Sequence, residues 1–352
     1  MKLVKNLVLL SGLLLALSCS CEKNIPATKS DSNPFYRLMF YNVENLFDTL
    51  DNPGTMDEEF MPEDDKNWNS VKYYDKLNKI ARVITDVGDG EYPAVIGLCE
   101  VENLSVLEGL CLATSLKEIG YQIVHKESPD FRGIDVALLF RPDVFKLLNY
   151  KTWPVWIPFS PDTRTREILY ACGELPGKDT IHIFANHWPS RSGGEVETRP
   201  KRVFVAEMLR SKVDSILAMD PDARIVITGD FNDEPTDLSI VSGLSAYSSF
   251  DDPQSNRLYN TSHFLQKNIK KGSYKYKGNW NMLDQFIISG ALLDTSANIY
   301  SSQFDVHLFE KNYLLEKDDT FLGDKPFRTY LGDYYHGGYS DHLPVYLDIR
   351  HK

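Results

Sequence analysis

Short apolar runs that end at polar residues recur along the chain from residue 36 onward. Their length and their content of β-branched and aromatic residues predict strands at residues 36–41, 94–98, 136–140, 181–185, 225–228, 286–288 and 345–349. Asn, Asp, Glu, His or Arg stands within a few positions of an end of each run. Buried strands that release polar residues at their ends are how α/β proteins place the chemistry of a site at the rim of a sheet.

Between these runs the apolar residues return every three or four positions, which predicts amphipathic helices at residues 73–87, 104–119 and 203–219. The stretches 48–68 and 302–335 are long, polar and loop-like, so we interpret them as insertions around a site. No internal repeat and no Pro/Gly linker divides the rest of the chain. The pattern therefore indicates one α/β domain over residues 35–352.

The first 34 residues have the composition of an export signal followed by a tether. Lys2 and Lys5 precede an apolar core at residues 7–17, which is too short to span a bilayer comfortably, and Cys19 follows small residues. We predict a lipoprotein-type signal peptide over residues 1–19 with Cys19 as the lipidated residue. A flexible tether over residues 20–34 would then hold an exported domain at a membrane facing the periplasm or cell surface. Cys21 is a rival for lipidation, and an ordinary secretory signal is the alternative.

The composition is that of a soluble globular protein, with 42% apolar and 25% charged residues, but the formal net charge is -12. Overall electrostatic attraction to nucleic acid or anionic lipid is thereby excluded, so a polyanionic substrate needs a local basic patch or a bound cation. One segment offers such a patch, because lysines and aromatic residues alternate at Lys267, Lys270, Lys271, Tyr274, Lys275, Tyr276, Lys277 and Trp280. It fits either a nucleic-acid contact or a solvated basic hairpin.

Three cysteines remain outside the signal region. Cys99, Cys111 and Cys172 have no metal-type spacing, and Cys99 and Cys172 lie in apolar segments. We interpret them as buried thiols, and one disulfide stays open as an alternative.

The most specific chemical pattern is the stretch ITGDFNDEP at residues 227–235, in which an apolar strand is followed by a glycine, a carboxylate and a carboxamide. Asp230 is suited to accept a proton from water, and Asn232 to donate a hydrogen bond to an oxyanion. An Asx turn that merely closes the strand is the structural alternative.

Other polar residues at strand ends add to this pattern. Asp341 and His342 lie just before the last strand, and Asp284 precedes the strand at 286–288 as a carboxylate for His342. His187 ends another strand and has a structural alternative as a satisfied core residue. Glu100 follows the strand at 94–98 and is a hard oxygen donor suited to Mg²⁺.

Taken in order, these motifs resemble the endonuclease/exonuclease/phosphatase superfamily of phosphoesterases. The resemblance rests on YNVENLF, LCEVEN, NHWPS, GDFND and SDHLP, and it covers the chain from about residue 36 to the C-terminus. It implies a four-layer α/β sandwich of two mostly antiparallel sheets flanked by helices, with the site at one rim. One departure is Cys99, which stands where glutamine is usual.

The resemblance also implies roles for individual residues. It makes Glu100 the main Mg²⁺ ligand, with Mn²⁺ as a substitute, and places Asn42 and Asp341 close to the metal. Asp230 would orient or deprotonate water and Asn232 would contact the phosphate, while Asp284 would pair with His342. Glu127 would orient His187, and Arg166 would contact the phosphate.

Three functions follow from this sequence. The leading hypothesis is an exported metal-dependent nuclease, a monomer that touches a membrane only through its lipid anchor. The second is a phosphatase or phosphodiesterase of lipid head groups or inositol phosphates, because the same metal site serves both. The third, a non-catalytic binding lipoprotein, is disfavoured by the retention of every acid, amide and histidine.

Overall fold

The computed structural model describes residues 35–352, so the predicted signal peptide and tether lie outside the described residues. The described residues form one compact unit. Within the described part of the chain, no helix has the length and apolar character needed to cross a membrane.

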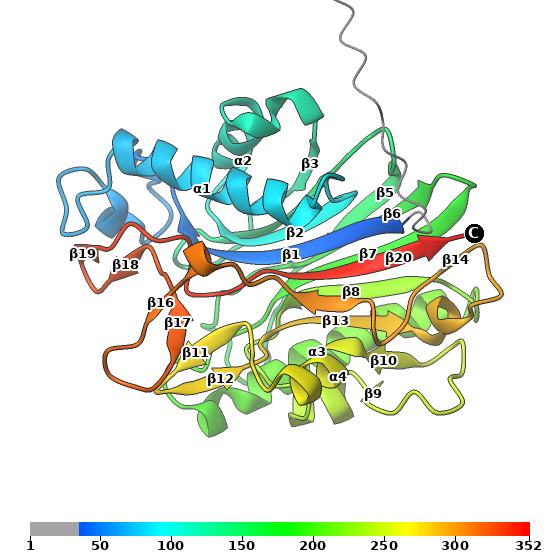
Figure 1. Ribbon diagram of the computed structural model, residues 1–352. Coiled ribbons are helices and arrows are strands. Elements are labelled where there is room, and N and C mark those ends of the chain that lie inside the picture. Colours follow the sequence, from blue (N-terminus) through cyan, green and yellow to red (C-terminus); the bar gives the residue numbers. More distant parts are fainter. Residues whose placement is uncertain (1–34) are drawn as a thin grey trace, which may run out of the picture. The chain divides into compact units, whose positions relative to one another are not determined.

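Two large sheets dominate the unit (Figure 1). In the first, β1 pairs in parallel with β2 and antiparallel with β20, and the other pairings are antiparallel. Its strands run in the order β14 (Ile299–Tyr300), β20 (Val345–His351), β1 (Phe35–Leu46), β2 (Val95–Val101), β4 (Asp135–Phe140) and β3 (Gln122–His125), with β15 (Val306–Leu308) also on β20.

The second sheet is again mostly antiparallel, and only the pairs β7–β8 and β9–β10 are parallel. Its strands run in the order β5 (Lys146–Trp153), β6 (Ile168–Leu175), β7 (Asp179–His187), β8 (Ile225–Asp230), β13 (Asp284–Ser289), β10 (Leu258–Asn260) and β9 (Ala246–Tyr247).

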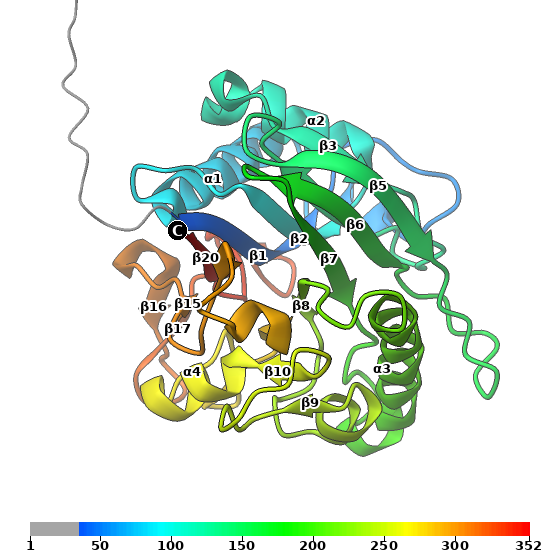
Figure 2. The same cartoon turned by 90° about the vertical axis from the view of Figure 1, so that its right-hand side faces the viewer.

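The sheets pack face to face, and helices cover their outer faces (Figure 2). The helices α1 (Ser70–Gly88) and α2 (Leu104–Leu112) pack on the first sheet, and α3 (Glu195–Leu217) packs on the second. A further helix, α4 (Thr261–Ile269), precedes β13. This arrangement confirms the expected four-layer α/β sandwich.

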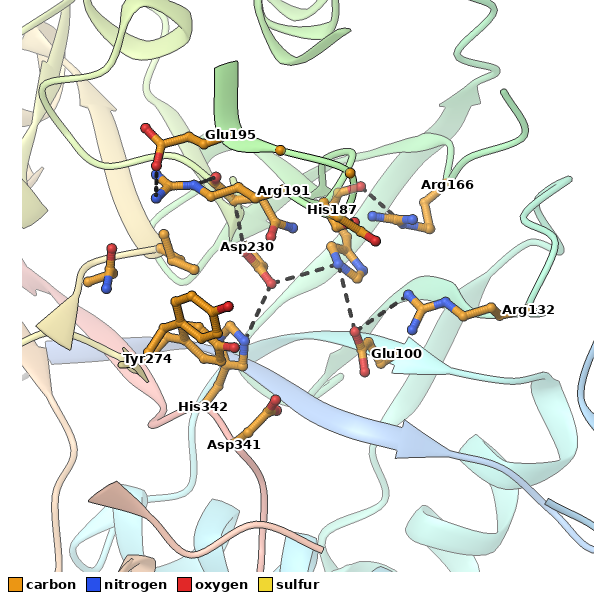
Figure 3. A pocket seen from close by; sticks show the side chains of 18 residues that line it. Glu100, Arg132, Arg166, His187, Arg191, Glu195, Asp230, Tyr274, Asp341 and His342 are labelled. Atoms are coloured by element: carbon orange, nitrogen blue, oxygen red, sulfur yellow. Dashed lines mark hydrogen bonds and ion pairs between the residues drawn. The ribbon is translucent and has the colours of Figure 1, made fainter. Parts of the chain in front are cut away.

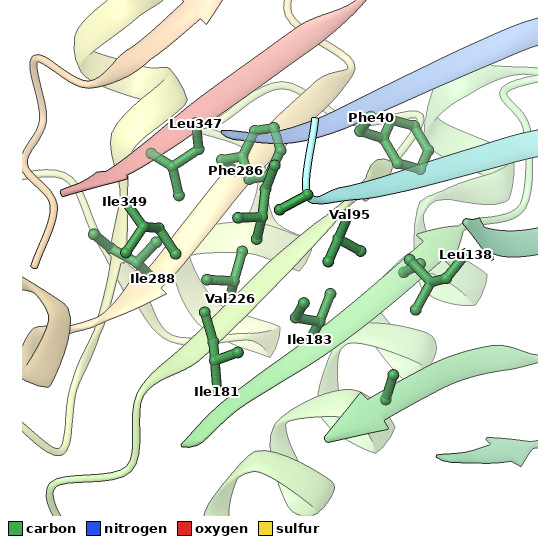
Figure 4. Close-up of a cluster of buried hydrophobic side chains, with 14 of the residues drawn as sticks. Phe40, Val95, Leu138, Ile181, Ile183, Val226, Phe286, Ile288, Leu347 and Ile349 are labelled. Atoms are coloured by element: carbon green, nitrogen blue, oxygen red, sulfur yellow. The ribbon is translucent and has the colours of Figure 1, made fainter. Parts of the chain in front are cut away.

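Successive side chains of a strand point to opposite faces of its sheet. Both faces of the central strands are covered, one by the other sheet and one by helices, so these strands are apolar throughout. In β1, Leu38 and Phe40 point into the core between the sheets, whereas Met39 and Tyr41 join the cluster beneath the helices. Figure 4 shows Phe40 and Val95 facing side chains of the second sheet such as Val226. Burying one such side chain contributes roughly 1.5–3 kcal/mol. Gly97 makes room for this packing, because a Cβ there would lie 2.7 Å from the Phe40 ring.

One predicted helix is divided. The pattern at residues 104–119 predicts a single helix, but α2 ends at Leu112 and a separate 3-10 helix covers Ser115–Ile119. Thr114 causes the break, because its hydroxyl accepts a hydrogen bond from the Leu116 N–H and donates one to the Leu110 carbonyl. That side chain therefore caps the second segment.

The insertion at residues 302–335 is structured, although its polar sequence predicts a loop. It contains β15 and two small hairpins, β16 (Leu315–Lys317) with β17 (Asp324–Pro326) and β18 (Tyr330–Leu331) with β19 (Tyr334–Tyr335). A third hairpin, β11 (Tyr274–Tyr276) with β12 (Asn279–Asn281), precedes β13. Short helical turns lie at Glu58–Phe60, Ser239–Gly243, Gly290–Leu293 and Asn312–Leu314.

The three cysteines in the described residues are free thiols. Cys99 and Cys111 are buried and Cys172 is partly buried, which confirms the interpretation as thiols and leaves no disulfide among them.

Candidate active site

Three neighbouring strands of the second sheet deliver polar residues to one place. His187 ends β7 and pairs in register with Asp230 at the end of β8, and Asp284 begins β13 opposite Asp230. Because β7 and β8 are parallel and β13 is antiparallel to β8, the three side chains meet at the same rim.

The first sheet contributes the other half of the site. Asn42 lies in β1 and Glu100 in β2, and His342 lies just before β20. Asn42 joins the two sheets, because its side-chain amide donates to Asp230 Oδ2 at 3.0 Å. Figure 3 shows Glu100, His187, Asp230, Asp341 and His342 around one open space.

Two residues of the site have a left-handed backbone conformation. Glu100 has φ 61° at a register shift between Cys99 and Val101, and Asn232 has φ 52°. A left-handed conformation is uncommon for residues other than glycine and clusters at functional sites, and a β-bulge redirects the side chain that it carries. Both features thus turn Glu100 and Asn232 away from an ordinary strand path toward the cavity that they line.

His342 is held as a charged acid. Its Nδ1 lies 2.6 Å from Asp284 Oδ2, and its Nε2 lies 3.8 Å from Asp230 Oδ2. Burial alone would lower the pKa of His342, but Asp284 and Asp230 outweigh it and raise that pKa well above its ordinary value. The predicted His342–Asp284 pair is therefore present.

The pKa of His187 is shifted in the opposite direction. Its Nε2 lies 3.7 Å from Asp230 Oδ2 and 3.9 Å from Glu100 Oε1, while its buried Nδ1 has no hydrogen-bond partner among the described residues. Burial, together with the charges of Arg166 and Arg132, lowers the pKa of His187 well below its ordinary value. The pKa values of the two histidines are thus shifted in opposite directions, the division that acid–base chemistry needs.

Asp230 lies between the two histidines and has its own altered pKa. Burial raises the pKa of Asp230 to about 6, although the charge of His342 favours the ionised form. The Asn232 N–H donates to Asp230 Oδ1 at 2.9 Å and fixes the carboxylate. A carboxylate with a pKa near neutrality can accept a proton from water and pass it on.

The structure does not bring Glu127 to His187, so this prediction is wrong. Glu127 is exposed and lies beside His125 and Asp135. Asp135 is buried and bonds His125 Nε2 at 2.9 Å, so Glu127 lies with this pair, while His187 Nδ1 has no hydrogen-bond partner among the described residues. The order of motifs along the chain predicted the pairing of Glu127, but the path of the chain in three dimensions decides which histidine this residue approaches.

Arg166 supports the site mainly from behind. It donates from Nε to the His187 carbonyl and from Nη2 to the Trp188 carbonyl, and Nη1 pairs with Asp130 at 2.9 Å. Since guanidinium has five N–H groups, two remain for a phosphate in the cavity that Arg166 lines. Its first role in this structure is to hold the turn that carries His187.

Several site residues are absent from the sequence prediction. Arg132 approaches Glu100 at 3.7 Å, and Arg328 bridges Glu44 at 3.2 Å and Asp341 at 3.0 Å. Arg191 and the glycines after it line the same cavity. The sequence RSGG at residues 191–194 directly follows NHWPS and could have indicated that Arg191 lies at the site. No sequence motif near Arg328 indicates a site.

The donor set fits a divalent metal ion. Glu100 and Asp341 supply carboxylate oxygens, and Asn42 Oδ1 accepts only the Glu44 N–H and keeps a second lone pair. Oxygen donors of this kind suit hard cations. The carboxylates of Glu100 and Asp341 lie 3.7 Å from Arg132 and 3.0 Å from Arg328, so a metal ion would share each of them with an arginine.

The cavity at this rim has a volume of about 810 Å³. Its lining includes six of the predicted site residues, Glu100, His187, Asp230, Asn232, Asp341 and His342. All eight predicted catalytic and metal residues thus gather at one rim, with Asn42 and Asp284 bonded to members of this lining.

The lysine cluster does not line this cavity. The Lys275 side chain is 2% exposed and pairs with Asp318 at 2.9 Å, and its Nζ also donates to the Leu322 carbonyl. Lys271 pairs with Glu310. Lys271 and Lys275 therefore hold the hairpin in place, whereas a nucleic-acid contact through Lys267, Lys270 and Lys277 stays a prediction.

We expect Asp284→Asn to move the alkaline limb of the pH–rate profile to lower pH. In the parent, Asp284 keeps His342 protonated above its ordinary pKa, and without that charge the pKa of His342 falls. Rate measurements as kcat/KM across pH test this, with Asp214→Asn on the surface of α3 as the control. An unchanged limb would mean that a different group controls it.

Two histidines on either side of a buried aspartate, facing a carboxylate suited to a metal ion, are typical of one class of protein, the phosphoesterases that work with a divalent metal ion. The chain belongs to the endonuclease/exonuclease/phosphatase family, whose model matches residues 37–351. No curated protein matches the sequence significantly.

Solved structures share the fold at low sequence identity. TDP2 of D. rerio complexed with a single-strand DNA product has a TM-score of 0.53 at 16% identity, covering 90% of this chain and 98% of that chain. The human Nocturnin catalytic domain with a bound sulfate anion has a TM-score of 0.52 at 16% identity, covering 92% and 97%. A family member from Bacteroides thetaiotaomicron has a TM-score of 0.50 at 14% identity, covering 91% and 96%.

Proposed function

We propose that this protein is an exported, Mg²⁺-dependent nuclease that hydrolyses phosphodiester bonds, with Mn²⁺ as a substitute. The observation that carries the proposal is the placement of Asp230 between a charged and a neutral histidine, facing Glu100 across one cavity. That arrangement supplies a base, an acid and a metal ligand to a single phosphorus centre.

The protein's own groups divide the work. Asp230 orients the attacking water and takes its proton, because its carboxylate is fixed by Asn42 and Asn232. The protonated His342 donates to a phosphate oxygen as charge develops in the transition state. Glu100, Asp341 and Asn42 would hold the metal ion, which when bound neutralises charge on the phosphate.

Nucleic acid is the favoured substrate for two reasons. The cavity lining includes Arg132, Arg166 and Arg191, so guanidinium groups that could meet phosphates lie beside the catalytic groups, each of them also paired with a carboxylate of the protein. A protein with the same fold, TDP2 of D. rerio, was solved with a single-strand DNA product. Lipid head groups and inositol phosphates are the second candidate, because the same catalytic groups would serve them.

An activity panel tests this function. Purified residues 35–352 should cleave DNA or RNA in Mg²⁺ or Mn²⁺, and should act weakly on sphingomyelin and inositol phosphates. Preferred cleavage of either of the latter would replace the nuclease proposal with the second candidate. Binding of these compounds without any hydrolysis would favour a non-catalytic lipoprotein.

The cellular location is part of the proposal and rests on the N-terminal sequence alone. Labelled palmitate should enter the full-length protein, and Cys19→Ala should abolish its incorporation. Loss only in Cys21→Ala would assign lipidation to Cys21. Incorporation into neither parent nor variants would leave an ordinary secretory signal.

A further inference from the structure

The β11–β12 hairpin presents its two tyrosines to the catalytic cavity and its lysine away from it. Tyr274 and Tyr276 line the cavity, whereas Lys275 between them points to Asp318. This division follows from the period of two in a strand, since alternate side chains lie on opposite faces. The alternation of lysines and aromatic residues therefore gives the hairpin an aromatic wall, Tyr274 and Tyr276, on the side of the cavity. Lys275 on the opposite side holds the hairpin to the rest of the protein.

Tyr274 places this wall directly beside the chemistry. Its ring packs on the His342 ring with centroids 4.8 Å apart and an interplanar angle of 32°, and its backbone pairs with His342. Figure 3 shows Tyr274 and His342 side by side at the edge of the open space. Tyr276 lies further out, and 57% of its surface is exposed.

The hairpin is held firmly, which fixes the backbone that carries the exposed Tyr276 ring. Lys275 Nζ bonds to Asp318 and to the Leu322 and Asp324 carbonyls, which fixes β11 to the insertion at 302–335. The turn contains Gly278 at φ 84°, where a Cβ would lie 3.0 Å from Phe321. A fixed aromatic surface loses little conformational entropy when a ligand packs on it.

Arg132 and Arg191 line the same cavity as the two tyrosines. Arg191 uses Nε on the Asn232 carbonyl at 2.6 Å, which places its guanidinium next to the GDFND turn. A substrate that meets arginines and tyrosine rings in one cavity should carry both phosphate and planar aromatic groups.

We propose that Tyr274 and Tyr276 form a stacking surface for an unpaired base of the nucleotide next to the scissile phosphate, so that the substrate is single-stranded nucleic acid. This proposal rests on the nuclease function above and narrows its substrate class. In a duplex the base faces are already stacked, and only an unpaired base can offer its face to a protein ring.

The alternative substrates do not fit this combination of arginines and tyrosine rings. Inositol phosphates have no planar ring to stack. Choline head groups bind aromatic faces as cations, but Lys277 Nζ already lies 5.2 Å from the Tyr276 ring centroid, and a second cation there would be repelled. The uncharged face of a nucleobase meets no such repulsion.

A cycle of protein and substrate changes tests the contact. A short single-stranded oligonucleotide and the same chain with an abasic residue next to the scissile phosphate are cleaved by the parent and by Tyr276→Ala. We expect the parent to lose roughly 5- to 150-fold in kcat/KM on the abasic chain, the range for one base–aromatic stack. In Tyr276→Ala this difference should shrink to a small factor, because the partner of the base is gone.

Matched variants separate stacking from folding. Tyr276→Trp should keep the difference between the two chains, and Tyr150→Ala, a tyrosine with 50% exposure on β5 outside the cavity lining, should behave like the parent. Equal losses on the abasic chain in parent and Tyr276→Ala would overturn the stacking proposal while leaving the nuclease function intact. A parent that cleaves neither chain would overturn the nuclease function itself, and this proposal with it.

Discussion

Glu100→Gln should lower phosphodiester hydrolysis by at least roughly a thousandfold while the fold stays intact, because a bound metal ion is worth several kcal/mol of transition-state stabilisation. The substitution removes the negative charge from the carboxylate that faces His187 across the cavity. Its shape is kept, so the Asn45 N–H still has an acceptor at that position. Single-turnover rates and circular dichroism measure the two effects separately.

Glu102→Gln is the matched control for this prediction. Glu102 lies two residues away on the same segment, is buried, and does not line the cavity. Burial raises its pKa to about 8, so near neutral pH it is largely uncharged and glutamine imitates it closely. Chelation with EDTA should reproduce the loss in the parent. Full activity in metal-free buffer would contradict the proposed mechanism.

Asp230→Asn and His342→Ala should each lower turnover by at least roughly a hundredfold, the scale for losing one positioned acid–base or oxyanion contact. The double variant should fall well short of the product of the two losses. The reason is structural, because His342 Nε2 lies 3.8 Å from Asp230 Oδ2 and each group alters the pKa of the other.

The measurement is kcat for the parent, both single variants and the double variant on one oligonucleotide. His307→Ala, a change at a histidine of β15 that does not line the cavity, is the control for removing an imidazole. Strictly multiplicative losses would show that Asp230 and His342 act independently. The site as described would then need a different general base.

Much of the architecture was predictable because it follows from local patterns. The apolar runs found the central strands, and their polar ends named the residues that the structure gathers at one rim. The ends of the predicted elements were less accurate: α3 begins at Glu195, eight residues before the predicted start, because its first turns are charged and contain Pro200. A periodic apolar pattern cannot detect a turn that has no apolar side chain facing the core.

Pairings between side chains on different loops were harder to predict from the sequence. The pair of Asp284 with His342 was expected from the resemblance and is present, yet Glu127 lies with Asp135 instead of His187. Both expectations came from the order of motifs along the chain. Order fixes which strand a residue follows, but the path of the 126–134 loop depends on contacts such as that of Asp130 with Arg166, which bring together residues 36 positions apart.

The sequence by itself determined the layered α/β fold and the set of acids, amides and histidines, because alternating burial and motif order are written in consecutive residues. Only the tertiary structure decided which charges are free to meet a substrate. Lys275 and Tyr276 belong to the same basic and aromatic segment, yet Lys275 pairs with Asp318 while Tyr276 lines the cavity, and Arg132 lines the cavity without a local signal. Strand register sets the face on which a side chain lies, and a partner far along the chain sets whether its charge is already neutralised.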